Sequence, residues 1–184
     1  MTAHTSSLSS GVAAVSSAAR VSVQAPCGRL SLRALGDLSA LEGALGLALP
    51  RKVGARAAAG ELQALCLGPD EWMLHAPLAA VSGLVEACAG VYGALPHSLV
   101  DVSGREVSFQ ISGPRAAELL TLGCARDIDT IAVGEGRRTL FDGSTVILWR
   151  DAADSFRMDV WNSFASHLLH LLEVGVRELA AEAL

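Results

Sequence analysis

The chain contains very little lysine and few aromatic residues, and it has no long apolar run. Only one of its 14 basic residues is a lysine, Lys52, and the formal net charge is −5. A basic stripe that could follow a phosphate backbone is therefore missing, which argues against nucleic-acid binding. No run of 18 apolar residues occurs, so the sequence predicts no membrane-spanning helix and no membrane partner.

Cysteine motifs are also missing. The four cysteines, Cys27, Cys66, Cys88 and Cys124, lie at least 22 residues apart and form no Cys-x-x-Cys pair. This spacing excludes a disulfide scaffold and a cysteine-based zinc site. The first 19 residues contain no lysine or arginine, whereas a secretory signal has a basic segment before its apolar core. We therefore expect a cytoplasmic protein with reduced thiols.

Aliphatic residues are abundant. Hydrophobic residues make up 51% of the 184 and aromatic residues only 4%, and the mean hydropathy is +0.41. This composition predicts a packed core of leucine, valine and alanine in one domain or two small lobes. The excess of apolar residues has two interpretations, which are apolar surface reserved for a partner and a core built of small side chains.

One order of signals occurs twice along the chain. Residues 29–35 alternate polar and apolar side chains and precede a helical pattern, and residues 105–111 repeat this about 77 positions later. The sequence predicts a disordered tail over 1–19 and one domain over 20–184, with approximate halves 20–97 and 98–184. The expected class is α+β with two ferredoxin-like halves. The expected strands are 29–35, 61–67, 71–75, 105–111, 137–141, 144–150 and 155–161, and the expected helices are 38–47, 77–89, 115–122 and 163–180.

The last predicted helix is amphipathic. Its apolar side carries Phe164, Leu168, Leu169, Leu171, Leu172, Val176 and Leu179. Its polar side carries His167, His170 and Glu173, whose spacing of three places them on one face. Three such side chains can hold zinc, or they can simply be the solvated face of the helix. The sequence offers no fourth ligand, which favours the solvated face.

Each of the other candidate sites can be interpreted either as functional or as purely structural. Residues 134–138 (GEGRR) resemble an anion loop, but no helix and no Lys-Ser/Thr follows, so a turn before a strand is favoured. Asp127 and Asp129 form a carboxylate pair that suits acid–base chemistry or the hydrogen bonds of a turn. Ser103 and Ser112 each precede a glycine, but no G-x-S-x-G motif surrounds them.

Large side chains on the predicted strands have two possible roles. Trp72, Trp149 and Trp161 suit either an interface or a core. Arg115, Arg137, Arg138 and Arg150 suit either partner carboxylates or a solvated surface. The residues alone therefore assign no catalytic, cofactor-binding or metal-binding position.

Four motifs, in this order and spacing, resemble the gamma subunit family of heterotetrameric sarcosine oxidase. They are LGPDEWML at 67–74, VDVSGREVSFQISGPRAAELLTLGCARDID at 100–129, RTLFDGSTVILWR at 138–150 and FRMDVWNSFASHLLHLLE at 156–173. The resemblance covers residues 20–173. It implies a fold similar to the folate-binding domain of the aminomethyltransferases of glycine cleavage.

The resemblance also implies a place in an enzyme complex. The family's enzyme oxidatively demethylates sarcosine to glycine with oxygen, producing hydrogen peroxide. The methyl carbon leaves as formaldehyde or is captured by tetrahydrofolate as methylenetetrahydrofolate. FAD, FMN and NAD are expected on the alpha and beta subunits and zinc on the delta subunit, with no cofactor or catalytic residue on this chain.

Three hypotheses remain open from the sequence. The first is a non-catalytic assembly subunit of sarcosine oxidase. The second is the equivalent subunit of a complex that acts on another N-methyl amino acid. The third is a stand-alone folate-binding module, for which the sequence offers no clear acidic anchor.

Overall fold

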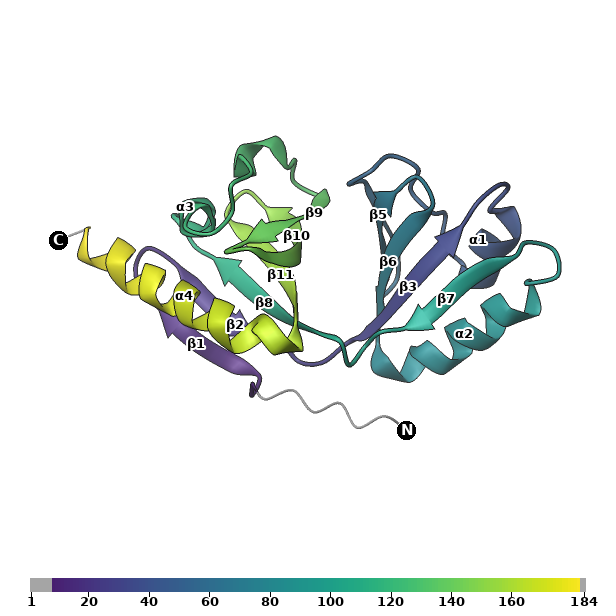
Figure 1. Ribbon diagram of the computed structural model, residues 1–184, viewed down its shortest axis with the longest axis horizontal. Helices are drawn as coiled ribbons and strands as arrows, with labels where there is room; N and C mark the ends of the chain where they lie inside the picture. The colour runs from purple at the N-terminus through teal and green to yellow at the C-terminus, as the bar shows by residue number, and fades with distance from the viewer. Residues whose placement is uncertain (1–7, 183–184) are drawn as a thin grey trace. The chain divides into compact units, whose positions relative to one another are not determined.

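The computed structural model describes residues 8–182. They divide into two compact units (Figure 1). Unit 1 joins the residues up to Ala25 to those from Gly104 onward, and unit 2 spans Pro26–Ser103. The expected halves, 20–97 and 98–184, are therefore wrong at their boundaries, because the N-terminal segment belongs with the C-terminal part of the chain.

Unit 2 is a five-stranded antiparallel sheet covered on one face by two α-helices. Its sheet order is β4-β5-β6-β3-β7, with β4 at one edge. Without β4, the chain runs strand, helix, strand, strand, helix, strand in the order of a ferredoxin-like fold. Its elements are β3 (Gly28–Ala34), α1 (Ser39–Leu45), β4 (Arg56–Ala59), β5 (Leu62–Gly68), β6 (Glu71–Ala76), the 3-10 turn η1 (Leu78–Ala80), α2 (Val81–Gly90) and β7 (His97–Asp101).

Unit 1 repeats this topology in a permuted chain order. Its sheet order is β1-β2-β8-β11-β10-β9, in which β2 takes the place that β7 has in unit 2. The last strand of this ferredoxin-like repeat therefore comes from the N-terminal segment. Its elements are β1 (Gly11–Val15), β2 (Arg20–Val23), β8 (Glu106–Ser112), α3 (Ala116–Thr121), η2 (Ile128–Thr130), β9 (Gly136–Phe141), β10 (Ser144–Ala152), β11 (Ser155–Trp161) and α4 (Asn162–Ala181). The predicted α+β class is confirmed.

The N-terminal segment is part of the fold of unit 1. Gly11–Val15 forms β1, so the expected disordered tail is wrong for this strand, whereas residues 1–7 lie outside the described residues. The side chains of Ala18 and Ala19 are buried in the core of unit 1. Small residues such as these carry no amphipathic period, which is why the sequence did not indicate their burial.

Two edge strands of unit 2 were also missed. β4 and β7 lie outside all the strands and helices that the sequence predicted. Neither strand contains a buried residue. The alternation of buried and exposed side chains that marks a half-buried strand is therefore weak in both.

The core of unit 1 lies between its sheet and α4, which runs along one face of the sheet (Figure 1). Alternate residues of β8 point into it, and Val107, Phe109 and Ile111 are buried as the alternation predicted. On the predicted apolar side of α4, the buried residues are Leu168, Leu169, Leu172, Val176 and Leu179. Leu171 is half-buried, and Phe164 is 43% exposed.

None of the helices in the part of the chain that the structure describes is long and apolar enough to cross a membrane.

Candidate functional site

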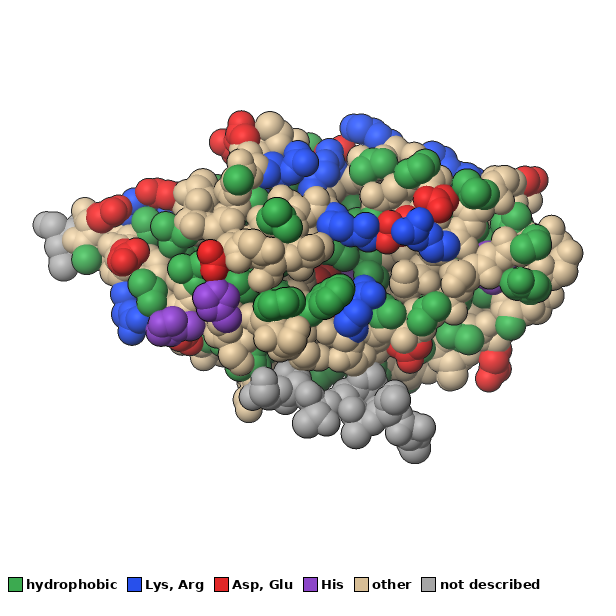
Figure 2. Space-filling view, viewed as in Figure 1, with side chains coloured by type: hydrophobic (Ala, Val, Ile, Leu, Met, Phe, Trp, Pro, Cys, Tyr) green, Lys and Arg blue, Asp and Glu red, His purple; other side chains and the backbone are tan. Residues whose placement is uncertain are grey.

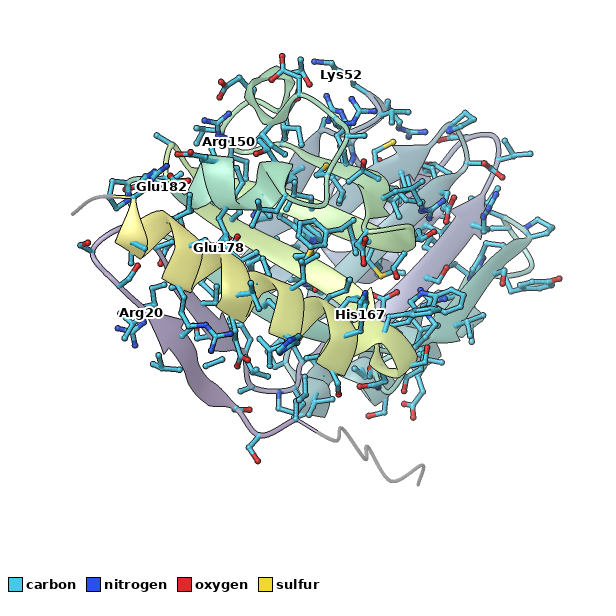
Figure 3. All side chains as sticks on the ribbon, turned by 60° about the vertical axis from the view of Figure 1, so that its left-hand side comes forward. Arg20, Lys52, Arg150, His167, Glu178 and Glu182 are labelled. Atoms are coloured by element: carbon cyan, nitrogen blue, oxygen red, sulfur yellow. The ribbon has the colours of Figure 1, made fainter. Side chains whose placement is uncertain are left out.

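The polar side of α4 is a solvated helix face. Nε2 of His167 lies 2.6 Å from the Oδ2 atom of Asp142, in the β9–β10 turn (Figure 3). Figure 2 shows histidine side chains gathered over α4 beside acidic and basic ones. Among residues 8–182, no group of three or more His, Cys, Asp or Glu side chains is placed to hold a metal ion.

The carboxylates and arginines around η2 stabilise loops. The Asp127 carboxylate accepts a hydrogen bond from the backbone N–H of Asp129 at 3.0 Å and so caps η2. Nη1 of Arg150 donates to the carbonyl of Ile131 at 2.9 Å. Gly134 has a φ of +84° and donates to the carbonyl of Arg150, so the glycine-rich segment is a turn before β9. The backbone hydrogen bond expected of Asp127 and the turn expected at 134–138 are confirmed, whereas Arg150 bonds to loop carbonyls and is not the solvated side chain that the sequence allowed.

Arg115 ties two helices of unit 1 together. Its guanidinium forms ion pairs with Glu118 and with Glu182 at the end of α4 (Figure 3), and donates to the carbonyl of Leu179 at 2.9 Å. The hydrogen bond from Arg115 lowers the pKa of the Glu118 carboxyl. Arg137 forms an ion pair with Glu135, two residues before it in the chain, at 2.7 Å.

The Ser103 hydroxyl, at the end of unit 2, is hydrogen-bonded within that unit. Its hydroxyl accepts a hydrogen bond from the backbone N–H of Arg29 at 2.9 Å and donates to the Oδ1 atom of Asp101 at 2.5 Å. These bonds join the two ends of the unit. Ser112 is the last residue of β8.

Two of the three tryptophans belong to the interior. Trp72 is buried, and its indole N–H donates to the carbonyl of Pro50 at 2.7 Å. Trp149 is buried, and its indole N–H donates to Oδ2 of Asp159 at 2.7 Å. Trp161, in contrast, is 46% exposed at the end of β11.

A buried carboxylate on β11 was missed by the sequence analysis. Asp159 is only 1% exposed, and its second oxygen accepts a short hydrogen bond from the Ser108 hydroxyl of β8. The Arg157 guanidinium lies 4.7 Å from the centroid of the Trp149 ring and is bonded to Asp151. Each oxygen of Asp159 therefore has a donor within the same sheet. These hydrogen bonds link β8, β10 and β11 across the sheet of unit 1.

A small pocket lies between α2 and β7. Its volume is about 170 Å³, and it is lined by Val85, Cys88, Ala89, Tyr92, His97 and Leu99. Burial raises the pKa of the Cys88 thiol, which keeps this cysteine protonated and weakly nucleophilic. Ligand pockets in proteins commonly measure about 300–1,000 Å³, so this one is too small for a flavin, a dinucleotide or a folate.

An exposed aromatic surface lies where β11 passes into α4. We call it the β11–α4 patch and define it by Arg105, Trp161, Asn162 and Phe164. The Arg105 guanidinium lies 5.8 Å from the centroid of the Trp161 ring. The side-chain N–H of Asn162 donates to the carbonyl of Gly104 at 2.5 Å. Trp161 is 46% exposed and Phe164 43% exposed.

Known proteins with similar sequences identify the family of this chain. The sarcosine oxidase gamma subunit family matches residues 35–178. The chain belongs to this family. A sarcosine oxidase subunit gamma from Arthrobacter sp. is 34% identical over 146 residues, covering 78% of this chain and 71% of the relative. A similar subunit from Corynebacterium sp. strain U-96 is 32% identical over 148 residues, covering 78% and 70% of the two chains.

Solved structures give the same family and fold. A chain of heterotetrameric sarcosine oxidase from Corynebacterium sp. U-96, in complex with pyrrole 2-carboxylate, aligns with a TM-score of 0.80 at 30% identity. The alignment covers 91% of this chain and 88% of that chain. Aminomethyltransferase T of the glycine cleavage system from Bartonella henselae aligns with a TM-score of 0.61 at 15% identity, over 82% and 44% of the two chains. The second match confirms the aminomethyltransferase-like fold and nothing more.

Proposed function

We propose that this chain is a non-catalytic assembly subunit of a heterotetrameric sarcosine oxidase, with alpha, beta and delta subunits as its partners. The observation that carries the proposal is the match to a chain of such an enzyme over 91% of this chain. A match of this extent includes both units, so most of the described chain has a counterpart in that assembly.

The complex would oxidise the N-methyl group of sarcosine. Sarcosine, oxygen and water give glycine, formaldehyde and hydrogen peroxide, or the methyl carbon passes to tetrahydrofolate. In this proposal FAD, FMN and NAD belong to the alpha and beta subunits and zinc to the delta subunit. The enzyme would act in the cytoplasm.

The side chains of the described residues support a structural role for this chain. Its buried carboxylate, Asp159, bonds to Trp149 and Ser108 of the same sheet. Its serine next to glycine, Ser103, holds the ends of unit 2 together. Asp159 and Ser103, the candidates for acid–base or nucleophilic chemistry, are thus each hydrogen-bonded within their own unit.

The test is co-expression of this chain, carrying an affinity tag, with the alpha, beta and delta subunits. The account predicts that the three partners elute with the tagged chain in a yellow complex. This complex is expected to produce hydrogen peroxide when sarcosine is added. Dimethylglycine and N-methylglutamate, assayed in parallel, separate sarcosine oxidase from a sister complex with another substrate.

A colourless eluate that contains the tagged chain alone would contradict the proposal. Titration of that lone chain with tetrahydrofolate would then test the stand-alone folate-binding module. Binding would show as heat or as a change in tryptophan fluorescence.

A further inference from the structure

β7 is the last strand of the unit 2 sheet and pairs on one side only, with β3 (Figure 1). The backbone N–H of Val102, just after β7, donates to the carbonyl of Arg29 of β3 at 2.9 Å. Because the backbone groups of an antiparallel strand face its partner at every second residue, Ser98 and Val100 also bond toward β3. The backbone groups of the alternate residues point away from the sheet, and these residues are His97, Leu99 and Asp101.

β7 lacks several features that commonly protect a sheet edge from a further strand. Basic side chains, proline and bulges serve this purpose. Among the other edge strands, β9 carries Arg137 and Arg138, and β4 carries Arg56. The pairing of β1 with β2 is irregular between Val12 and Ala14. β7 has the sequence HSLVD, without lysine, arginine or proline, and its pairing with β3 continues without a shift.

The pocket between α2 and β7 lies beside this open edge. Val85, Cys88 and Ala89 line it from α2, and Leu99 lines it from β7. In neighbouring strands, directly opposed residues place their side chains on the same face of the sheet. A residue opposite Leu99 in an added strand would therefore direct its side chain to the face that α2 covers, where the pocket lies.

The pocket has room for one side chain of medium size. Its volume is about 170 Å³, and a cavity of about 150 Å³ can hold a benzene ring. The side chains of Val85, Cys88 and Leu99 offer it apolar atoms, so a leucine or phenylalanine side chain fits. Binding by strand addition uses this combination, because main-chain hydrogen bonds supply the affinity and a pocket selects the side chain.

One wall of the pocket is already ordered. The Nδ1–H group of His97 donates to the carbonyl of Leu95 at 2.7 Å. The centroid of the His97 ring lies 5.5 Å from that of the Tyr92 ring. Both rings line the pocket. A wall that is fixed in advance loses little conformational freedom when a segment binds.

α2 and β7 carry acidic side chains and no lysine or arginine. Residues 77–101 contain two acidic residues, Glu86 and Asp101. The Asp101 carboxylate accepts hydrogen bonds from Ser103, whereas Glu86 is exposed on α2, one turn before Ala89. A segment with a basic side chain next to its apolar one therefore complements the charge beside the pocket.

A second copy of this chain is a poor complement to this edge. The β7 side chains that it would direct to the pocket, those of His97 and Leu99, already line its own pocket. A symmetric contact would also bring two Glu86 carboxylates to the same edge without a basic residue from α2 or β7. The complementary occupant is therefore a different chain.

We propose that an extended segment of another subunit of the oxidase adds to β7 as a sixth strand of the unit 2 sheet. This segment places a leucine- or phenylalanine-sized side chain in the pocket, opposite Leu99, and a basic side chain beside Glu86. The inference rests on the proposed function, because it takes its partner from the assembly.

Competitive co-expression tests the pocket. Wild-type chain and a variant, with different tags, are expressed with the alpha, beta and delta subunits, and their ratio is measured in the purified complex. Ala89→Phe fills the pocket from α2 and removes a central contact, so we expect about 30-fold weaker binding and the variant in about one complex in thirty. Glu86→Arg should be depleted less strongly, because it changes only the charge beside the pocket.

Ala87→Phe is the matched control. Ala87 is exposed on the same helix and does not line the pocket, so this variant should enter the complex as often as the wild-type chain. The soluble amount of each variant, read from its own tag, reports folding. If Ala89→Phe lowers that amount, Glu86→Arg and the measurement on the wild-type complex that follows decide the question.

Amide hydrogen exchange of the wild-type complex tests the backbone pairing. The outward amide of Leu99 should exchange as slowly as the inward amides of Ser98 and Val100, because the added strand accepts its hydrogen bond. Fast exchange at Leu99 beside slow exchange at its two neighbours would overturn the proposal.

Equal incorporation of soluble Ala89→Phe and Ala87→Phe would also overturn it. A homodimer of the free chain that Ala89→Phe dissociates would overturn it in favour of a second copy. Failure of the wild-type chain itself to join the complex would instead overturn the proposed function.

Discussion

The backbone N–H of Arg115 donates to the carbonyl of Ala18 at 3.0 Å, which joins the start of α3 to a segment almost one hundred positions earlier. Ala18 and Ala19 are buried beside this bond. Together with β1 and β2, the contact makes the N-terminal segment part of unit 1. Its removal should therefore damage the fold of the C-terminal half of the chain.

Deletion of residues 2–19 should leave unit 1 without β1 and without the buried alanines. Their loss exposes core side chains of the sheet and α4, so we expect little soluble protein and no cooperative thermal unfolding of unit 1. Soluble yield and circular dichroism against temperature measure this. Deletion of residues 2–7 is the control, because it keeps every contact described above. Native-like unfolding of the longer deletion would show that the segment is dispensable.

Gly113→Ala should destabilise unit 1. Gly113 has a φ of +122°. A Cβ added there would lie 2.9 Å from the carbonyl oxygen of Ala18 and 2.9 Å from the Cα atom of Ala19. Strain of this kind costs about 1–3 kcal/mol. Denaturant unfolding should show the loss as a lower midpoint.

Gly83→Ala is the matched control for that substitution. Gly83 lies inside α2, and an added Cβ meets no atom within 4 Å. Because alanine favours helix more than glycine does, this variant should gain up to about 1 kcal/mol. Equal midpoints for the two alanine variants would contradict the role given to Gly113.

Asp159→Ala should lower the free energy of unfolding by about 3 kcal/mol, because it leaves the buried indole N–H of Trp149 and the hydroxyl of Ser108 without their acceptor. Ser108→Ala removes one donor and keeps the carboxylate, so it should cost about 1 kcal/mol. Urea unfolding curves of both variants measure the difference. A wild-type midpoint for Asp159→Ala would show that this network does not stabilise the sheet.

The ion pair of Arg115 and Glu118 should make stability depend on acid pH. Arg115 holds the pKa of Glu118 below its ordinary value of 4.5. The stabilisation is complete above that ordinary value and is lost as the pH falls through the lowered pKa of the folded state. Glu118→Gln should therefore flatten the decline of the melting temperature below about pH 4.5. Glu86→Gln, which removes an exposed carboxyl of α2, is the control, and equal acid slopes for both variants would contradict the prediction.

Local patterns in the sequence predicted much of the fold. The expected strand 155–161 matches the bounds of β11, and the expected strands 137–141 and 144–150 are joined by a tight turn at Asp142-Gly143, with φ values of 45° and 74°. Both signals depend on residues close together in the chain. The pattern of strands and helices was therefore sufficient to predict two ferredoxin-like repeats.

Long-range pairing was beyond the reach of those patterns. β1 pairs with β2, and β2 pairs with β8, which lies more than eighty positions away. Asp159 is buried because donors on β8 and β10 satisfy it, and no period in the sequence reports such partners. Phe164 fits the apolar side of α4 but lies beyond the core, so the helical period alone placed it incorrectly.

The central claim is that this chain serves as one subunit of a larger oxidase. Native mass spectrometry of the co-expressed, affinity-purified material tests it most directly. The account predicts a species whose mass equals this chain plus one alpha, one beta and one delta subunit, with bound flavin and sarcosine-dependent peroxide production. Recovery of this chain only as a monomer or a homo-oligomer, while the other subunits form an active enzyme without it, would contradict the account.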